Sequence, residues 1–150
     1  MKKAVATVFG QIPLAIGRRV LFRTTNLPVL AVEDADADAY LIRRALIDNP
    51  KISQVVLAKD GVEALQMIDQ HDAEPDVAVI DLHMPRKDGF ALLRELSLSD
   101  RPQFPAIVLT SSVSTIDIVR SWKRGAVKFL TKPNSIGELA AVLDNAIAQF

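Results

Sequence analysis

A short apolar run that ends directly in an acidic residue constrains the fold of this chain most strongly. Residues 77–80 are all apolar, three of them are β-branched, and Asp81 follows at once. Such a run is typical of a strand that is covered on both faces, as in the centre of a parallel sheet. Ligands of open α/β sheets bind at the carboxyl ends of the strands. Asp81 is therefore a candidate for chemistry or metal binding, and its alternative role is to cap the next helix.

Strands and helices alternate along most of the sequence. Apolar runs predict five strands, at residues 29–32, 54–58, 77–80, 106–109 and 127–130. A segment with apolar residues at helical spacing follows each of them. Five such units in about 120 residues predict a flavodoxin-like, doubly wound α/β fold, in which helices cover both faces of a five-stranded parallel sheet.

Small polar residues mark the starts of several predicted helices. We expect Asp36 to cap the first helix, Ser114 or Thr115 to cap the fourth, and Ser135 to cap the fifth. The fifth helix carries an apolar stripe that should face the core, formed by Ile136, Leu139, Leu143 and Ile147.

Composition limits the classes of protein to which this chain can belong. A chain of 150 residues with 49% hydrophobic and 24% charged residues is typical of one soluble globular domain. It contains no cysteine, which excludes disulfides, thiolate metal sites and a cysteine nucleophile. No apolar run approaches the ~20 residues of a membrane span. We therefore expect a cytoplasmic protein that does not associate with membranes.

The formal net charge of zero conceals two oppositely charged parts. Residues 1–27 hold five of the 18 lysine and arginine residues and no acid, so they carry +5, and residues 28–150 carry −5. An acidic body argues against DNA binding, since DNA-binding domains usually present a basic face. We interpret residues 1–27 as a basic arm, either flexible or docked on a partner, and residues 28–150 as the domain. An additional strand or translated upstream sequence are alternatives for the arm.

Polar residues stand at the ends of four predicted strands. Glu33 and Asp34 follow the first strand, Asp81 the third, Thr110 the fourth and Lys132 the fifth. If these strands are neighbours, their side chains meet at one edge of the sheet. Three carboxylates packed together would repel one another without a cation, and Mg²⁺ prefers such oxygen ligands.

The order and spacing of these residues resemble the receiver domain of two-component response regulators, over about residues 28–150. The matching elements are Glu33-Asp34, Asp81 with Met84-Pro85 and Asp88-Gly89, Leu109-Thr110-Ser111, Gly125-Ala126, and residues 129–133. Among receivers, segments 32–38, 40–46 and 82–89 are most similar to the single-domain regulators that are paired with bacterial phytochromes.

This resemblance implies that Asp81 accepts a phosphoryl group from a sensor histidine kinase or a histidine phosphotransfer protein, with a bacteriophytochrome as the candidate kinase. It also implies that Asp34, Asp81 and the backbone carbonyl of His83 hold Mg²⁺. Glu33 stands where Asp is commoner, so it would reach the ion directly or through water. The His83 side chain would modulate loss of the phosphoryl group and would not donate one.

The resemblance further assigns the residues that respond to phosphorylation. Lys132 would pair with Asp81 and later with a phosphoryl oxygen, and the Thr110 hydroxyl would donate to another oxygen. Thr110 and Phe129 would form the switch, in which the aromatic ring turns inward as Thr110 moves. Ordinary roles remain as alternatives: Lys132 could be a solvated lysine, and Phe129 could belong to the core.

The sequence ends with the fifth helix, so we expect the receiver to signal through its own conformation or oligomeric state and not to act as an enzyme. In the fourth helix, Ile116 and Val119 follow one line and Ile118 and Trp122 another, so one apolar line should stay uncovered. Val142 and Phe150 of the fifth helix should be exposed as well. These residues predict a homodimer through the fourth helix, fifth strand and fifth helix.

Two other functions remain open. The chain could be a receiver-like docking module that is never phosphorylated. A magnesium-dependent phosphohydrolase of the haloacid-dehalogenase type also uses an aspartate at a strand end, but it normally needs a second aspartate two positions later, where this chain has His83.

Overall fold

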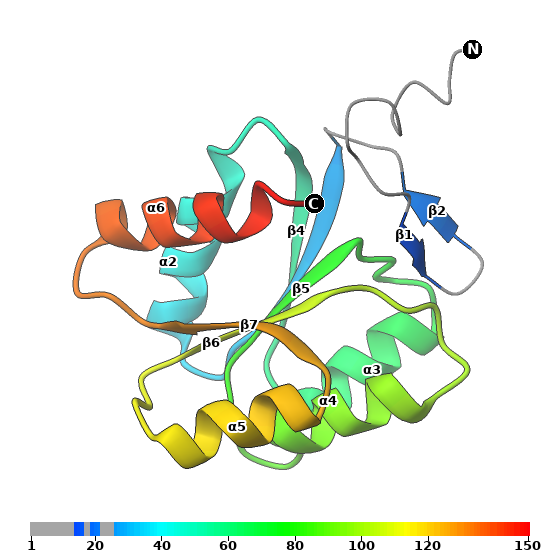
Figure 1. Cartoon of the computed structure of the whole chain (residues 1–150). Helices are drawn as coiled ribbons and strands as arrows, with labels where there is room; N and C mark the ends of the chain where they lie inside the picture. The colour runs from blue at the N-terminus through cyan, green and yellow to red at the C-terminus, as the bar shows by residue number, and fades with distance from the viewer. Residues whose placement is uncertain (1–13, 17–18, 22–25) are drawn as a thin grey trace.

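The computed structural model describes residues 14–16, 19–21 and 26–150. Its main sheet consists of five parallel strands in the order β4-β3-β5-β6-β7 (Figure 1). The strands are β3 (Leu27–Val32), β4 (Ile52–Ala58), β5 (Val77–Ile80), β6 (Ala106–Thr110) and β7 (Ala126–Thr131). In this order β3, the first strand of the sheet along the chain, lies between β4 and β5, which confirms the predicted flavodoxin-like fold.

Helices cover both faces of this sheet. They are α2 (Asp36–Ile47), α3 (Gly61–Asp69), α4 (Gly89–Leu98), α5 (Thr115–Lys123) and α6 (Ile136–Ile147). Helices α2 and α6 lie on one face, and α3, α4 and α5 lie on the other (Figure 1). Among the described residues, none of these helices has the length and apolar character needed to span a membrane.

The central position of β5 in the sheet explains why its sequence is apolar throughout. Val77 and Val79 pack in the core that α2 and α6 cover, and Ala78 and Ile80 pack in the core that α3 and α4 cover. All four side chains are buried. Because successive side chains of a strand point to opposite faces, a strand covered on both sides has no polar position.

The helix starts agree with the prediction at two of the three expected caps. Ser114 accepts a hydrogen bond from the Asp117 amide, and Ser135 accepts one from the Glu138 amide. The expected cap at Asp36 is wrong, because Asp36 is the first residue of α2 and Ala35 precedes the helix in extended conformation. The Ala35 amide donates to Oε1 of Glu33, so a residue outside the helix satisfies this group.

A short antiparallel hairpin precedes the main sheet. Strands β1 (Leu14–Ile16) and β2 (Arg19–Leu21) form a separate two-stranded sheet within the predicted arm, and the other residues of the arm up to 25 lie outside the described residues. Strand β3 begins two residues before the predicted start, since Leu27 is buried and pairs with Ile52.

The structure corrects the predicted surface of α6. Ile136, expected in the core, is 45% exposed because it opens the helix, one turn before the first buried residue Leu139. Val142 and Phe150, expected to be exposed, are half-buried against the core that α2 and α6 share. On α5, Ile116 and Val119 form an exposed apolar line, as predicted. Trp122 is exposed as well, although it belongs to the other line, which was expected to be covered, and its neighbour on that line, Ile118, is only half-buried.

Candidate functional site

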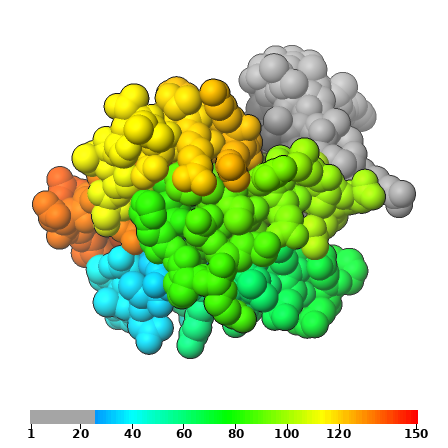
Figure 2. All heavy atoms as spheres, turned by 90° about the horizontal axis from the view of Figure 1, so that it is seen from below, coloured from blue at the N-terminus to red at the C-terminus, as the bar shows by residue number. Residues whose placement is uncertain are grey.

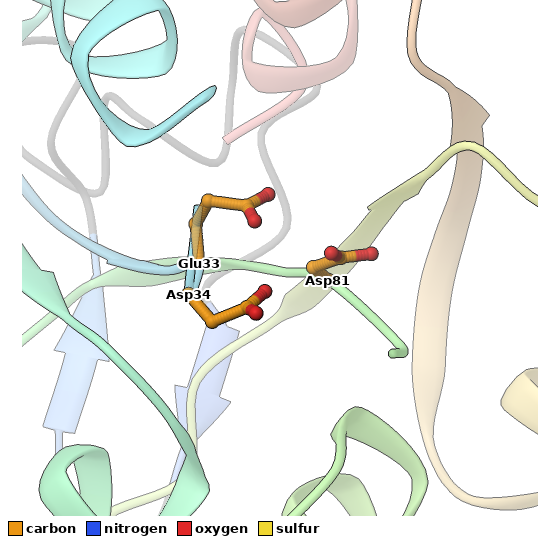
Figure 3. A group of neighbouring side chains, drawn as sticks. All are labelled: Glu33, Asp34 and Asp81. Carbon is orange, nitrogen blue, oxygen red and sulfur yellow. The ribbon is translucent and has the colours of Figure 1, made fainter. Parts of the chain in front are cut away.

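Three carboxylates meet where β3 and β5 end. Glu33 and Asp34 follow β3, Asp81 follows β5, and these two strands are hydrogen-bonded neighbours. One oxygen from each of the three side chains lies within 4.8 Å of the others. Figure 3 shows the three side chains, Glu33 and Asp34 from the end of β3 and Asp81 from the end of β5. The predicted convergence of Glu33, Asp34 and Asp81 is therefore confirmed.

The three carboxylates differ in burial and in their hydrogen bonds. Glu33 and Asp81 are buried, and Asp34 is exposed. The Leu82 amide donates to Oδ1 of Asp81 at 2.8 Å, and the Ala35 amide donates to Oε1 of Glu33 at 3.1 Å. Burial raises the pKa of Glu33 to about 7, although the hydrogen bonds from Lys132 and Ala35 act in the opposite direction. Glu33 therefore changes its protonation near neutral pH.

Lys132 supplies positive charge to the acidic pocket that Glu33, Asp34 and Asp81 form. Its Nζ lies 2.6 Å from Oε2 of Glu33, 2.8 Å from Oδ2 of Asp38 and 3.4 Å from Oδ2 of Asp81. Its backbone amide donates to the carbonyl of Thr110 at 2.8 Å, which ties the end of β7 to the end of β6. Burial acts to lower the pKa of Lys132, but the hydrogen bonds to Asp38 and Glu33 outweigh it and raise that pKa. The lysine is charged.

These contacts differ in detail from those that the resemblance implied. Lys132 does contact Asp81, but Asp81 is the most distant of its three carboxylate partners. Asp38 was not identified from the sequence. It lies 94 positions from Lys132 in the sequence, in the first turn of α2. The only signal in the sequence that could have identified it is its position in the acidic segment that follows β3.

The two predicted switch residues lie on the neighbouring strands β6 and β7, and Lys132 directly follows β7. Thr110 is buried at the end of β6, and its Oγ1 accepts a hydrogen bond from the Ser112 amide at 3.4 Å. Phe129, on β7, is half-buried and packs against the core that α3 and α4 cover. A partly buried ring has room to change its position, which is compatible with the predicted role.

The His83 side chain contacts the first turn of α5. Its Nε2 lies 3.4 Å from Oδ2 of Asp117, and its ring meets the Phe90 ring edge-on at 6.3 Å between centroids. Asp117 also accepts a hydrogen bond from Ser112 Oγ at 2.6 Å. These contacts, which the sequence did not reveal, link the loop after β5 to the first turn of α5.

A glycine closes the loop that holds Asp81. The Gly89 amide donates to the Leu82 carbonyl at 3.0 Å, and a Cβ at position 89 would overlap with the backbone carbonyl of Asp81. Asp88 caps the following helix α4 by accepting from the Ala91 amide. The Asp88-Gly89 pair therefore turns the chain sharply back and fixes the backbone around Asp81.

Comparisons with known proteins agree with this arrangement. The family model of the response regulator receiver domain matches residues 29–144. The solved structure of the phosphorylated cyanobacterial phytochrome response regulator RcpA aligns with a TM-score of 0.73 and 29% identity, covering 81% of this chain and 91% of the other. The manganese-bound form of response regulator Rcp1 aligns with a TM-score of 0.70 and 27% identity, covering 79% of this chain and 90% of the other.

Curated relatives include proteins of different lengths. Response regulator Rcp1 of Synechocystis is 28% identical over 74% of this chain and 80% of its own length. Response regulator MprA of Mycobacterium leprae is 40% identical over 75% of this chain, but the chain spans only 47% of MprA. The chain spans only 15% of the sensor histidine kinase CheAY of Helicobacter pylori, at 32% identity over 79% of this chain. These matches confirm the predicted resemblance, including that to phytochrome-associated regulators, and the chain belongs to the family of response regulator receiver domains.

Proposed function

We propose that this receiver accepts a phosphoryl group on Asp81 from a sensor histidine kinase or a histidine phosphotransfer protein. Oδ1 of Asp81 is held by the Leu82 amide, and Oδ2 points into the pocket toward Lys132. Oδ2 would attack phosphorus while the bond from phosphorus to the imidazole nitrogen of the donor breaks. The observation that carries this proposal is a buried carboxylate held between a lysine and two further carboxylates at a strand end.

The donor atoms around Asp81 fit a magnesium ion. Glu33, Asp34 and Asp81 offer oxygen atoms within 4.8 Å of one another, and we assign the backbone carbonyl of His83 as a further ligand. When bound, Mg²⁺ neutralises charge on the phosphoryl group during transfer. The manganese-bound structure of the relative Rcp1 supports this proposal.

The residues around the pocket would convert phosphorylation into a change of shape. Lys132 would turn from Glu33 and Asp38 toward a phosphoryl oxygen, and the Thr110 hydroxyl would donate to another. Because Lys132 and Thr110 are joined by a backbone hydrogen bond, movement of either strand end is transmitted to the other. Phe129 would then fill the space that Thr110 leaves, and the receiver would signal through its conformation or its oligomeric state.

The similarity to RcpA and Rcp1 supports a phytochrome-type kinase as the phosphodonor. We propose that this phosphoryl transfer takes place in the cytoplasm. Residues 28–150 would form the receiver domain, and residues 1–27 a basic arm. Among the described residues, every side chain assigned to the pocket lies between 33 and 132. Deletion of residues 1–25 should therefore leave phosphorylation of Asp81 intact.

A homodimer through α5, β7 and α6 is part of the proposal. Trp122 on α5, Val127 on β7 and Ile136 on α6 are 58%, 49% and 45% exposed. Exposed apolar residues on three consecutive elements favour a protein interface. Light scattering at micromolar concentration should give twice the monomer mass, and Trp122→Glu or Val127→Glu should reduce it. A monomer with and without phosphodonor would reject the dimer.

Intact-mass measurement tests the central proposal. Incubation with a small phosphodonor and Mg²⁺ should add one phosphoryl group, and omission of Mg²⁺ or the substitution Asp81→Asn should abolish the addition. Asp34→Asn should still fold but label more slowly, because one metal ligand is lost. Labelling that persists in Asp81→Asn would overturn the assignment, and an unlabelled wild type would favour a docking module.

A further inference from the structure

A groove of about 700 Å³ lies between α4 and α5, away from the acidic pocket. On the face shown in Figure 2, α5 (yellow to orange) lies next to α4 (green). Leu98 on α4 and Ile116 and Val119 on α5 supply the apolar part of its lining. Leu98 is 74% exposed and Ile116 is 76% exposed, so this apolar surface faces solvent. Covering it would be favourable, because apolar area would leave water.

Helix α5 contributes this surface because few of its side chains are buried. Its sole buried residue is Ser121, whose hydroxyl donates to the Asp117 carbonyl within the same helix. Because Ile116 and Val119 are exposed, their apolar side chains are available to another molecule.

The charges around the groove all have the same sign. Four cations line it, namely Arg94, Arg120, Lys123 and Arg124, and no carboxylate of the described residues does. Within the described part of the chain, none of the four forms an ion pair. The Arg120 guanidinium stacks on the Phe90 ring at 4.0 Å, and Arg124 donates to the Phe90 carbonyl at 3.4 Å. Both contacts hold these cations at the groove without neutralising them.

Neighbouring cations behave differently. Lys87 lies 2.6 Å from Glu95, and Arg101 lies 2.7 Å from Asp69, so each has its own carboxylate partner. Residues 28–150 carry −5 as a whole. The groove therefore concentrates unpaired positive charge on an otherwise acidic body, next to exposed apolar side chains.

We propose that the groove between α4 and α5 binds an acidic amphipathic helix of a partner protein. Apolar residues on one face of that helix would cover Leu98, Ile116 and Val119, and flanking carboxylates would pair with the four cations. The basic arm of this chain carries +5 and would be repelled. Nucleic-acid phosphates would match the cations but leave the apolar lining uncovered. Helix α5 has nine residues, about 14 Å, which fits two to three turns of a partner helix.

A synthetic peptide tests this proposal on the full chain. The probe is a fluorescein-labelled helix of about 14 residues, with leucine at positions i, i+3, i+4 and i+7 and glutamate at most others. Fluorescence anisotropy should show saturable binding at about 0.05 M salt and at least tenfold weaker binding at about 0.5 M salt. A peptide of the same composition with its leucines scattered around the helix, and one with lysine in place of glutamate, should not bind.

Matched variants locate the binding site. Ile116→Glu should reduce peptide affinity at least tenfold, and Arg94→Gln combined with Lys123→Gln should do the same. Tyr40→Glu, at an exposed aromatic residue on α2, should leave the affinity unchanged. Circular dichroism and labelling of Asp81 check that each variant folds.

Two results would overturn the proposal. One is no binding of the acidic peptide to the wild type, and the other is an equal loss of peptide affinity in Ile116→Glu and Tyr40→Glu. If the wild type does not bind the peptide but forms a dimer that dissociates in Ile116→Glu, the groove belongs to a second copy of this chain.

Discussion

Two regions of this receiver concentrate charge in opposite ways. In the acidic pocket, Glu33 and Asp81 are 3% and 7% exposed, and the ammonium group of Lys132 contacts both. In the groove between α4 and α5, four cations lie together without a carboxylate partner among the described residues. The pocket holds unlike charges that are buried and paired, and the groove holds like charges close to water.

The difference follows from the cost of burying charge. A charge that leaves water must be compensated by an opposite charge or by hydrogen bonds, so Glu33 and Asp81 require Lys132 within the same chain. Exposed like charges repel only weakly, since water and salt screen them. A paired pocket is suited to chemistry inside the molecule, and an unpaired groove is suited to recognition of a second molecule.

The largest effect that tests this comparison should come from Lys132→Met. It leaves Glu33 and Asp81 without their cation, and we expect the free energy of unfolding to fall by about 3 kcal/mol without Mg²⁺. Mg²⁺ should restore much of this loss, since the ion brings positive charge to the same carboxylates. Urea unfolding, followed by the fluorescence of the single tryptophan, measures both values.

Lys128→Met is the matched control for that experiment. Lys128 lies on the same strand β7 and makes no ion pair within the described residues, so its loss should cost less than about 0.5 kcal/mol. Equal destabilisation by the two variants would show that pairing does not distinguish the pocket.

The pH dependence of Mg²⁺ binding should report the burial of Glu33. The pKa of Glu33 is about 7, so the carboxyl group must release a proton to bind the ion at lower pH. Mg²⁺ affinity should rise by up to tenfold per pH unit from about pH 5.5 to 7 and level off above. Titration calorimetry at several pH values measures this slope, and Glu33→Gln should flatten it. An unchanged slope in Glu33→Gln would assign the proton to another group.

The same raised pKa affects stability in a defined direction. The folded protein holds the Glu33 proton more tightly than the unfolded chain, whose ordinary value is 4.5. The contribution of Glu33 to stability is therefore greatest below pH 4.5 and falls as the pH rises through about 7. Mg²⁺ opposes this loss because it binds the ionised form.

A smaller effect is expected from Asp38→Asn. Lys132 would lose one of its two shorter contacts and shift toward Glu33 and Asp81, where the phosphoryl oxygens arrive. We expect phosphorylation by a small phosphodonor to become about two- to fivefold faster, because a half-exposed ion pair contributes ~1 kcal/mol or less. Asp36→Asn, in the same turn of α2, is the control and should leave the rate unchanged. A slower rate in Asp38→Asn would show that Asp38 positions Lys132 productively.

The smallest effect should come from removing charge at the groove. Arg94→Gln combined with Lys123→Gln should change the free energy of unfolding by less than about 0.5 kcal/mol. At low salt the variant should be slightly more stable than the wild type, because repulsion between cations is relieved, and the difference should vanish at high salt. Thermal melting at two salt concentrations checks this. A loss of stability above about 1 kcal/mol would show that these cations belong to the fold.

The sequence by itself determined the fold and the location of the pocket. An apolar run such as 77–80 is stable only between two layers, and parallel strands place their carboxyl ends along one edge. These two local rules bring Glu33, Asp34 and Asp81 together, as the structure confirms. The caps at Ser114 and Ser135 were predictable for the same reason, because a cap depends on residues within one turn.

Only the tertiary structure decided which partners these residues take. Nζ of Lys132 contacts carboxylates that lie 51, 94 and 99 positions away in the sequence, and its three distances to them differ by less than 1 Å. Helical periodicity on α5 and α6 shows which residues share a line but not which line the neighbouring elements cover. The sequence therefore misplaced Ile136 and Val142 and did not reveal the cationic groove. Local patterns depend on a few adjacent residues, whereas pairing and exposure depend on how whole elements pack against one another.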